Sequence, residues 1–107
     1  MIKRRLLVAP QAMTATANPY YTVSDGVSAQ IMGVTLHNPT AAPITVKVYY
    51  ANQSAAADAT NQVLSRTLQD GESYPCPELV NHTLSAGMSI QALGDGAVIV
   101  VSGVTFT

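Results

Sequence analysis

The stretch "PITVKVYY", residues 43–50, alternates between side chains that favour burial and side chains that tolerate water. Successive side chains of a β-strand point to opposite faces, so a period of two is typical of a strand with one buried face. One face of this strand would carry Ile44, Val46, Val48 and Tyr50. This pattern predicts a strand and is incompatible with a helical period.

Two longer stretches carry related patterns. In "AQIMGVTLHN", residues 29–38, the side chains of Met32, Val34 and Leu36 share one side, and "NPTAAP" after it predicts a turn. We therefore expect residues 29–38 and 43–50 to form a hairpin-like pair. The stretch "GAVIVVSGVTFT", residues 96–107, is apolar on both faces, which predicts a long C-terminal strand covered on both sides, with a bulge at Gly103.

The remaining chain predicts short strands separated by turns. Glycines at 24–26, 69–71, 85–87 and 93–96 recur at intervals typical of a β-sandwich. The stretch "ANQSAAADATNQV", residues 51–63, favours an excursion loop over a short helix. The chain is thus predicted to be all-β: one domain, residues 1–107, folded as a single antiparallel β-sandwich or jelly roll of about eight strands. The shorter candidates are Arg4–Val8, Tyr20–Val23, Val63–Gln69, Ser73–Cys76 and Met88–Leu93.

Charge is scarce in this chain. Charged residues make up 10% of it and the net charge is −1, whereas soluble domains average about 25% charged residues. No electrostatic argument therefore favours a nucleic-acid or membrane partner. The apolar run after the basic start is too short for a signal peptide, and no stretch approaches a membrane span. A weakly charged surface resembles an interface core, so we expect self-association, with a trimer or another closed ring as the form.

The stretch "CPELVNHT", residues 76–83, contains a thiol, a carboxylate and an imidazole in Cys76, Glu78 and His82. Catalysis would require the thiol and the imidazole within hydrogen-bond reach. Pro75 and Pro77 suggest an extended backbone, in which Cys76 and His82 would lie about 20 Å apart. We therefore predict no enzyme: a buried Cys76, a surface Glu78, and a His82 bonded to a backbone carbonyl. His37 and His82 could share a metal only with a third ligand, so no metal or cofactor is predicted.

Two groups of residues are candidates for a protein interface. Three of the five Lys and Arg side chains cluster in "MIKRRLL". Residues 1–5 could be a solvated terminus or a basic arm that binds an acidic neighbour, while the alternation of Arg4, Leu6 and Val8 argues for a strand that presents its cations. Adjacent tyrosines would place one ring of each pair outward, where Tyr favours interfaces. The candidates are Lys3, Arg4, Arg5, Tyr20, Tyr21, Tyr49 and Tyr50.

The order of motifs adds a family resemblance. "YYTVSDG", "IMGVTLHNPTAAP", "ITVKVYYA", "NQSAAADATNQVL", "LQDGES", "LSAGMSIQA" and "GAVIVVSGVTF" follow one another between residues 5 and 107. This layout resembles small β-sandwich virion proteins of tailed bacteriophages. The resemblance implies a non-enzymatic capsid decoration or cement protein that binds itself and the major capsid protein, or else a neck, tail or baseplate component that binds tail proteins. It implies location in the virion after assembly in the host cytoplasm.

A carbohydrate-binding module is a more remote alternative. Sandwich domains often bind glycans, but sugar rings are usually held by aromatic platforms, and this chain has no Trp.

Overall fold

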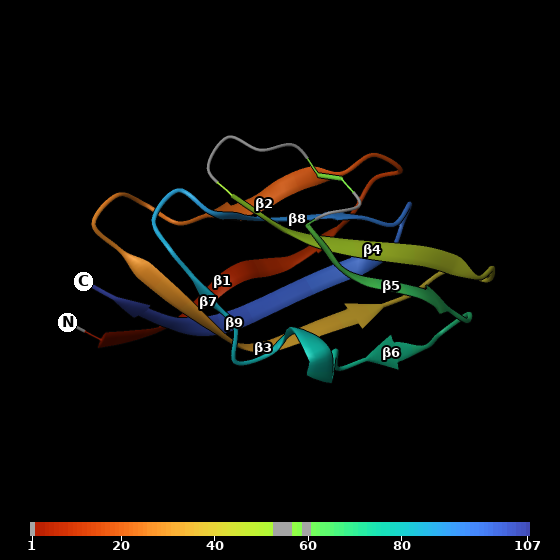
Figure 1. The fold of residues 1–107 in the computed structure, drawn as a ribbon. Coiled ribbons are helices and arrows are strands. Elements are labelled where there is room, and N and C mark those ends of the chain that lie inside the picture. The colour runs from red at the N-terminus through yellow and green to blue at the C-terminus, as the bar shows by residue number, and fades with distance from the viewer. Residues whose placement is uncertain (1, 53–56, 59–60) are drawn as a thin grey trace.

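The computed structural model describes residues 2–52, 57–58 and 61–107. Within them nine strands form two antiparallel sheets that pack face to face, which confirms the predicted β-sandwich (Figure 1). In this part of the chain no helix is long and apolar enough to cross a bilayer. The elements are β1 (Ile2–Ala12), β2 (Asn18–Thr22), β3 (Ser28–His37), β4 (Ile44–Ala51), β5 (Gln62–Leu68), β6 (Ser73–Tyr74), the 3₁₀ helix η1 (Pro77–Leu79), β7 (Thr83–Leu84), β8 (Ser89–Leu93) and β9 (Val98–Phe106).

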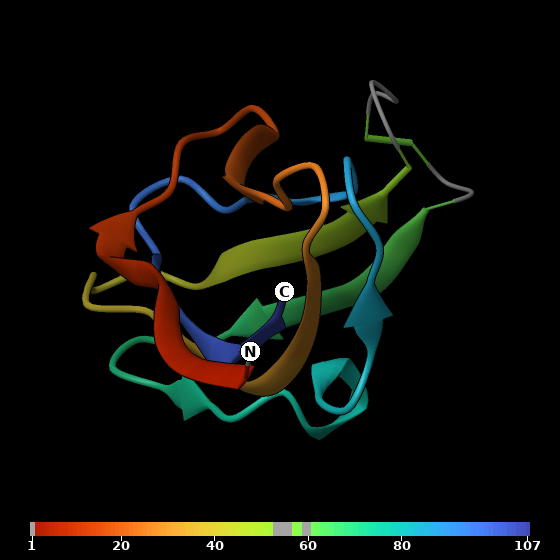
Figure 2. The same ribbon diagram turned by 90° about the vertical axis from the view of Figure 1, so that its left-hand side faces the viewer.

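We call the two layers sheet A and sheet B. Sheet A has the order β1-β9-β3-β6, with β7 paired to a different part of β3, and sheet B has the order β2-β8-β4-β5. Viewed from the end that holds both termini, the two layers enclose the core (Figure 2). Burial of each large aliphatic side chain there contributes about 1.5–3 kcal/mol. The fully buried side chains include Ile31, Leu36, Val46, Val48, Leu68, Leu84, Ile90, Ile99 and Val101.

All eight strands predicted from the sequence are present, and the two-residue β7 is the one strand of the described chain that was not predicted. The turn glycines behave as expected, since Gly71 and Gly96 have φ values of 72° and 89°. Within the predicted excursion at 51–63, Ala51 ends β4 and Gln62 begins β5, and residues 53–56 and 59–60 lie outside the described residues. The predicted hairpin-like pair is wrong, because β3 pairs with β9 in sheet A while β4 pairs with β8 and β5 in sheet B.

The chain between β3 and β4 therefore crosses from one sheet to the other, and Asn38 holds this crossover. Its buried side-chain amide donates to the carbonyls of Ala42 and Leu68, at 2.7 and 3.1 Å. Its side-chain oxygen accepts from the backbone N–H and the hydroxyl of Thr40. The side chain thereby ties the crossover to the end of β5, and all its hydrogen-bonding groups are satisfied.

A bulge in β3 reverses the predicted orientation of Met32. Ile31 pairs with Gly103 of β9, but Gly33 pairs with Ser102, so Met32 is an extra residue without a partner on β9. The inward positions consequently change phase at the bulge: Ala29 and Ile31 are buried before it, and Val34 and Leu36 after it. Met32 is 51% exposed, so its predicted burial beside Val34 and Leu36 is wrong.

The bulge predicted at Gly103 lies instead on the two strands beside it. On β1, Leu6 pairs with Ser102 and Val8 with Val101, which leaves Leu7 as an extra residue opposite the bulge of β3. Gly103 itself stays in register with both neighbours. A Cβ atom at Gly103 would collide with the Gln30 carbonyl oxygen, so this residue is glycine because the backbone of β3 comes unusually close.

The basic segment belongs to a strand. Residues 2–5 pair with β9 from Phe106 to Gly103. The segment is therefore a strand that presents its cations, and not a solvated terminus or a free arm. β1 is an edge of sheet A. A second register shift lies between Val8 and Gln11, where Pro10 supplies no N–H. Bulges, Pro and cations are the usual protection of an edge strand against further pairing.

Candidate functional site

The thiol and the imidazole of residues 76–83 do not form an accessible catalytic pair. Cys76 is fully buried, as predicted, and its thiol lies 3.5 Å from the Tyr74 carbonyl oxygen. The predicted extended backbone is wrong at this point, because Cys76 has the left-handed angles φ 51° and ψ 61° and is the N-cap residue before η1. Glu78 lies within η1, and its side chain is outside the described residues. A substrate cannot reach a thiol that has no exposed surface.

His82 and Tyr50 form an aromatic contact next to this turn. Their ring centroids lie 5.6 Å apart at an interplanar angle of 66°, an edge-on geometry. The Tyr50 hydroxyl donates to the Leu79 carbonyl oxygen at 2.7 Å. Burial raises the pKa of Tyr50, and the nearby Cys76 adds to this rise, so Tyr50 is a neutral donor at physiological pH. Tyr50 and His82 thus fasten η1 against β4.

The second histidine has a separate environment. His37, at the end of β3, shares a 2.7 Å hydrogen bond between its Nδ1 and the Ser73 hydroxyl of β6. Over the described ranges, no group of three His, Cys, Asp or Glu side chains gathers in a way that could hold a metal.

The tyrosines predicted at an interface are largely inside the molecule. Tyr49 and Tyr50 are 7% and 9% exposed, so the expectation that one ring of this pair is exposed at the surface is wrong. Tyr20 and Tyr21 are half-buried against the core. A register shift between Pro19 and Tyr21 makes Tyr20 an extra residue of β2, which explains how both rings of this pair contact the same core.

The outward side of sheet A carries exposed and half-buried apolar side chains. The side chains of β9 alternate, with Ile99 and Val101 buried inward and Val98, Val100 and Val104 half-buried on the outer side. Across the sheet, the exposed large hydrophobic side chains of the described chain are Ile2, Leu6 and Met32, which are 69%, 56% and 51% exposed. We call the outward side of β1, β9 and β3 the outer face.

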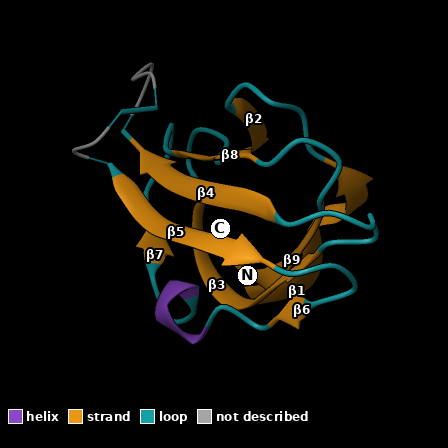
Figure 3. Ribbon diagram, turned by 90° about the vertical axis from the view of Figure 1, so that its right-hand side faces the viewer, coloured by secondary structure: helices purple, strands orange, loops and turns teal. Residues whose placement is uncertain are grey.

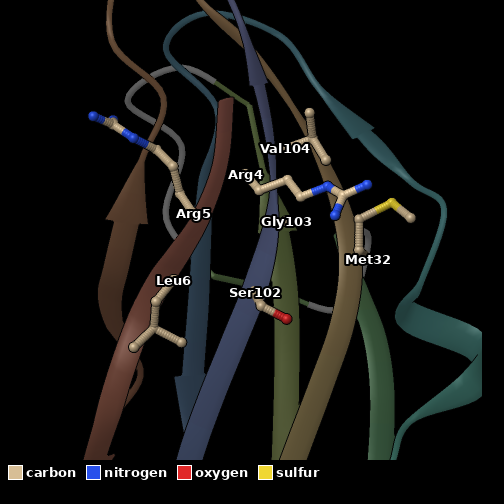
Figure 4. A pocket seen from close by; sticks show the side chains of 7 residues that line it. All are labelled: Arg4, Arg5, Leu6, Met32, Ser102, Gly103 and Val104. Carbon is tan, nitrogen blue, oxygen red and sulfur yellow. The ribbon is translucent and has the colours of Figure 1, made fainter. Parts of the chain in front are cut away.

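A shallow hollow lies on the outer face where the two bulges flank β9. Leu6 of β1 and Met32 of β3 form its sides, and the small Ser102 and Gly103 form its floor. Arg4 extends across β9 toward Met32, whereas Arg5 points the other way (Figure 4). We call this the basic hollow; its volume is about 450 Å³, and it is lined by Arg4, Arg5, Leu6, Met32, Ser102, Gly103 and Val104.

The cations of this region are not paired with carboxylates of the described structure. Lys3, Arg4 and Arg5 are exposed, and none of them makes an ion pair with a described residue. By contrast Arg66, in β5, lies 3.4 Å from a carboxylate oxygen of Glu72. The basic hollow therefore combines an apolar base with positive charge, which suits a partner that presents apolar side chains and a carboxylate.

Sequence reasoning found the cations of this surface but missed Met32. The basic cluster is visible in the sequence because Lys3, Arg4 and Arg5 are consecutive. Met32 was assigned to the core because the alternation of residues 29–38 does not reveal the bulge. The glycine after it, Gly33, was the one available signal.

Comparison with known proteins does not extend this description. A scan against protein-family models finds no matching family, and a search of curated proteins finds no match.

Proposed function

We propose that this protein is a non-enzymatic structural component of a bacteriophage virion, a capsid decoration or cement protein that self-associates and binds the capsid lattice. The observation that carries the proposal is the outer face, where Ile2, Leu6 and Met32 are exposed beside cations that lack ion pairs with described residues. Such a surface is suited to contact with protein.

The apolar character of the outer face supports self-association. An antiparallel sheet that faces water normally alternates apolar residues inward with polar residues outward. β9 instead places Val98, Val100 and Val104 on its outward side, next to Leu6 and Met32. Contiguous apolar surface of this kind marks interaction sites on soluble proteins. A second protein surface laid over the outer face would bury these side chains.

The virion role rests on the order of strand and turn motifs together with the low charge of the chain. An assembly in which neighbours cover much of each subunit tolerates a surface with few Lys and Glu residues. The partners in this proposal are further copies of the chain and the major capsid protein, and the alternative is a neck, tail or baseplate position with tail proteins as partners. Nucleic acid and membrane have no part in either proposal.

A carbohydrate-binding role receives less support. Sugar rings stack on exposed aromatic side chains, but the rings of Tyr20, Tyr21, Tyr74 and Phe106 are half-buried and those of Tyr49 and Tyr50 are buried. Tyr74 is additionally covered by the Arg66 guanidinium.

Sedimentation of the purified protein at micromolar concentration tests self-association. We expect an oligomer that is weakened at least tenfold in a variant with Leu6→Ser and Met32→Ser. The matched control is Gln62→Ser, an exposed strand residue of sheet B, which should leave the oligomer unchanged. A monomer at all concentrations would contradict self-association.

The copy number of the protein in purified particles tests the virion role. Hundreds of copies would support decoration of the capsid, whereas a few to a few dozen would favour the neck, tail or baseplate. Absence from the particles would overturn the virion role while leaving self-association to be judged by sedimentation.

A further inference from the structure

The two ends of the sandwich carry opposite charge. Phe106 pairs with Ile2 and Ser28 at one end of sheet A, and Val98 pairs with Ala12 and His37 at the other. The first end holds both termini and the cations of Lys3, Arg4 and Arg5 (Figures 1 and 2). It also holds Asp25, in the turn before β3, which leaves a surplus of positive charge among its described side chains.

The opposite end of the sandwich faces the viewer in Figure 3, and two of its turns contain an aspartate. Asp70 lies in the turn between β5 and β6, and Asp95 lies in the turn between β8 and β9. Both side chains belong to exposed residues, and neither makes a hydrogen bond or ion pair with a described residue. The long axis of the molecule measures 42 Å, so these charges are far from the cations of the same chain.

Asp95 borders a depression of about 360 Å³ that is lined by both apolar and polar residues. Ile44 and Leu93 contribute half-buried aliphatic side chains to it, and Pro43 is exposed. We call this surface the acidic patch; it is lined by Ala15, Pro43, Ile44, Thr45, Leu93 and Asp95. It therefore offers the basic hollow some aliphatic side chains and a charge of the opposite sign.

We propose that the basic hollow of one copy binds the acidic patch of the next, so that copies associate head to tail. This inference rests on the self-association proposed above and specifies which surfaces meet. Arg4 would meet the Asp95 carboxylate, a pairing for which the planar guanidinium is suited because it can donate two parallel hydrogen bonds. Leu6 and Met32 would be covered by the aliphatic side chains around Asp95.

Charge selects this arrangement over a symmetric one. If two basic hollows faced each other across a two-fold axis, Arg4 would approach Arg4 of the partner, and like charges brought together are unfavourable. A head-to-tail contact instead places cations against carboxylates. Because the two surfaces lie at opposite ends, every bound copy keeps one free surface of each kind, and the contact either closes into a ring or continues as a filament.

Charge reversal at each surface tests the pairing. Arg4→Glu and Asp95→Lys should each weaken self-association at least tenfold in sedimentation velocity at micromolar concentration and low salt. An equimolar mixture of the two variants should associate again, because the intact basic hollow of one variant meets the intact acidic patch of the other. Gln62→Glu, on an exposed residue of β5, and Asp25→Lys are the controls and should behave like the unaltered protein. Unchanged thermal unfolding would show that each variant is folded.

A second measurement identifies the contact directly. In a Cys76→Ser background, Met32→Cys and Thr45→Cys placed in separate chains should form an intermolecular disulfide under mild oxidation. Samples in which every chain carries only Met32→Cys, or only Thr45→Cys, should form this intermolecular disulfide much less efficiently.

The outcomes separate this inference from the function on which it rests. If the unaltered protein self-associates and both charge-reversal variants associate equally well, the head-to-tail contact would be overturned and self-association would stand. The same conclusion would follow if Arg4→Glu weakened association and Asp95→Lys did not. An unaltered protein that stays monomeric would overturn both.

Discussion

The guanidinium carbon of Arg66 lies 3.9 Å from the centroid of the Tyr74 ring. Arg66 belongs to β5 of sheet B and Tyr74 to β6 of sheet A, so this cation–π contact joins the two sheets along one side. The same guanidinium also contacts Glu72, in the turn that connects the two strands. One side chain thus fastens the edge of the sandwich at which the chain passes from one layer to the other.

Replacing Arg66 should loosen this edge. We expect Arg66→Gln to lower the free energy of unfolding by about 0.5–1 kcal/mol, the usual contribution of a partly exposed cation–π contact. Urea denaturation measures the change, and a double-mutant cycle with Tyr74→Leu isolates the contact itself. Lys47→Gln, on the neighbouring strand β4, is the control for loss of one positive charge. Equal effects of the two Gln variants would contradict a specific role for the Arg66–Tyr74 contact.

Glu72 should make stability depend on pH in the acid range. The Gln69 backbone N–H donates to its carboxylate at 2.8 Å, and this bond, helped by Arg66, lowers the pKa of Glu72 below its usual value of 4.5. The unfolded chain therefore takes up a proton at higher pH than the folded protein does. The stabilisation is present above the unfolded pKa and is lost as pH falls through the folded pKa.

We expect Glu72→Gln to reduce the fall in melting temperature between pH 6 and pH 3 relative to the unaltered protein. Asp70→Asn, in the same turn but without a hydrogen bond to a described residue, is the control and should leave the profile nearly unchanged. Parallel profiles for the unaltered and Glu72→Gln proteins would show that this carboxylate does not contribute.

The strands of this fold were predictable because their pattern is local. The alternation in residues 43–50 directly reflects burial of Val46, Val48 and Tyr50 on one face of β4. The partners of the strands were not predictable in the same way. β3 pairs with β9, which is more than 60 residues away in the chain, so the proximity of β3 and β4 in sequence was misleading.

The surface was only partly predictable for a related reason. The three consecutive cations are visible in the sequence, but the basic hollow is formed only when Leu6 and Met32 lie on either side of Ser102. That arrangement depends on bulges in β1 and β3, which face each other across β9. A bulge shifts the alternation of inward and outward side chains by one residue. The sequence of one strand does not reveal the position of the bulge, because the bulge is defined by the pairing with the neighbouring strand.

Asn38 should be among the least replaceable polar residues. Asn38→Ala would leave the carbonyls of Ala42 and Leu68 and the backbone N–H of Thr40 without these partners. Each unsatisfied buried group costs about 1–3 kcal/mol, so we expect a total loss of about 2–4 kcal/mol, because water can reach part of this turn. Chemical denaturation tests this, with Thr40→Val as a milder variant that removes only the hydroxyl. A loss below that of Thr40→Val would contradict the assigned role of Asn38.

Cys76 and His82 should be dispensable for association. Cys76→Ser changes a buried thiol and His82→Ala removes an exposed ring that packs on Tyr50, and neither residue lines the basic hollow. We expect modest losses of stability and an unchanged sedimentation profile for both variants. Loss of a hydrolytic or transferase activity in either variant, with the fold intact, would contradict the non-enzymatic proposal.

Gly103 should resist even the addition of a methyl group. A Cβ atom there would collide with the Gln30 carbonyl oxygen and would lie 2.9 Å from Cδ1 of Leu7, so both strands beside β9 would have to move. Overpacking of this kind costs about 1–3 kcal/mol, and the rigid backbone contact with β3 places Gly103→Ala at the upper end of that range.

Gly33→Ala is the matched control on the same sheet. Its Cβ would lie 3.3 Å from the hydroxyl of Ser102, a side chain that can rotate away, so its loss should be smaller. Equal stability of the two alanine variants would show that β3 can withdraw from β9 without loss.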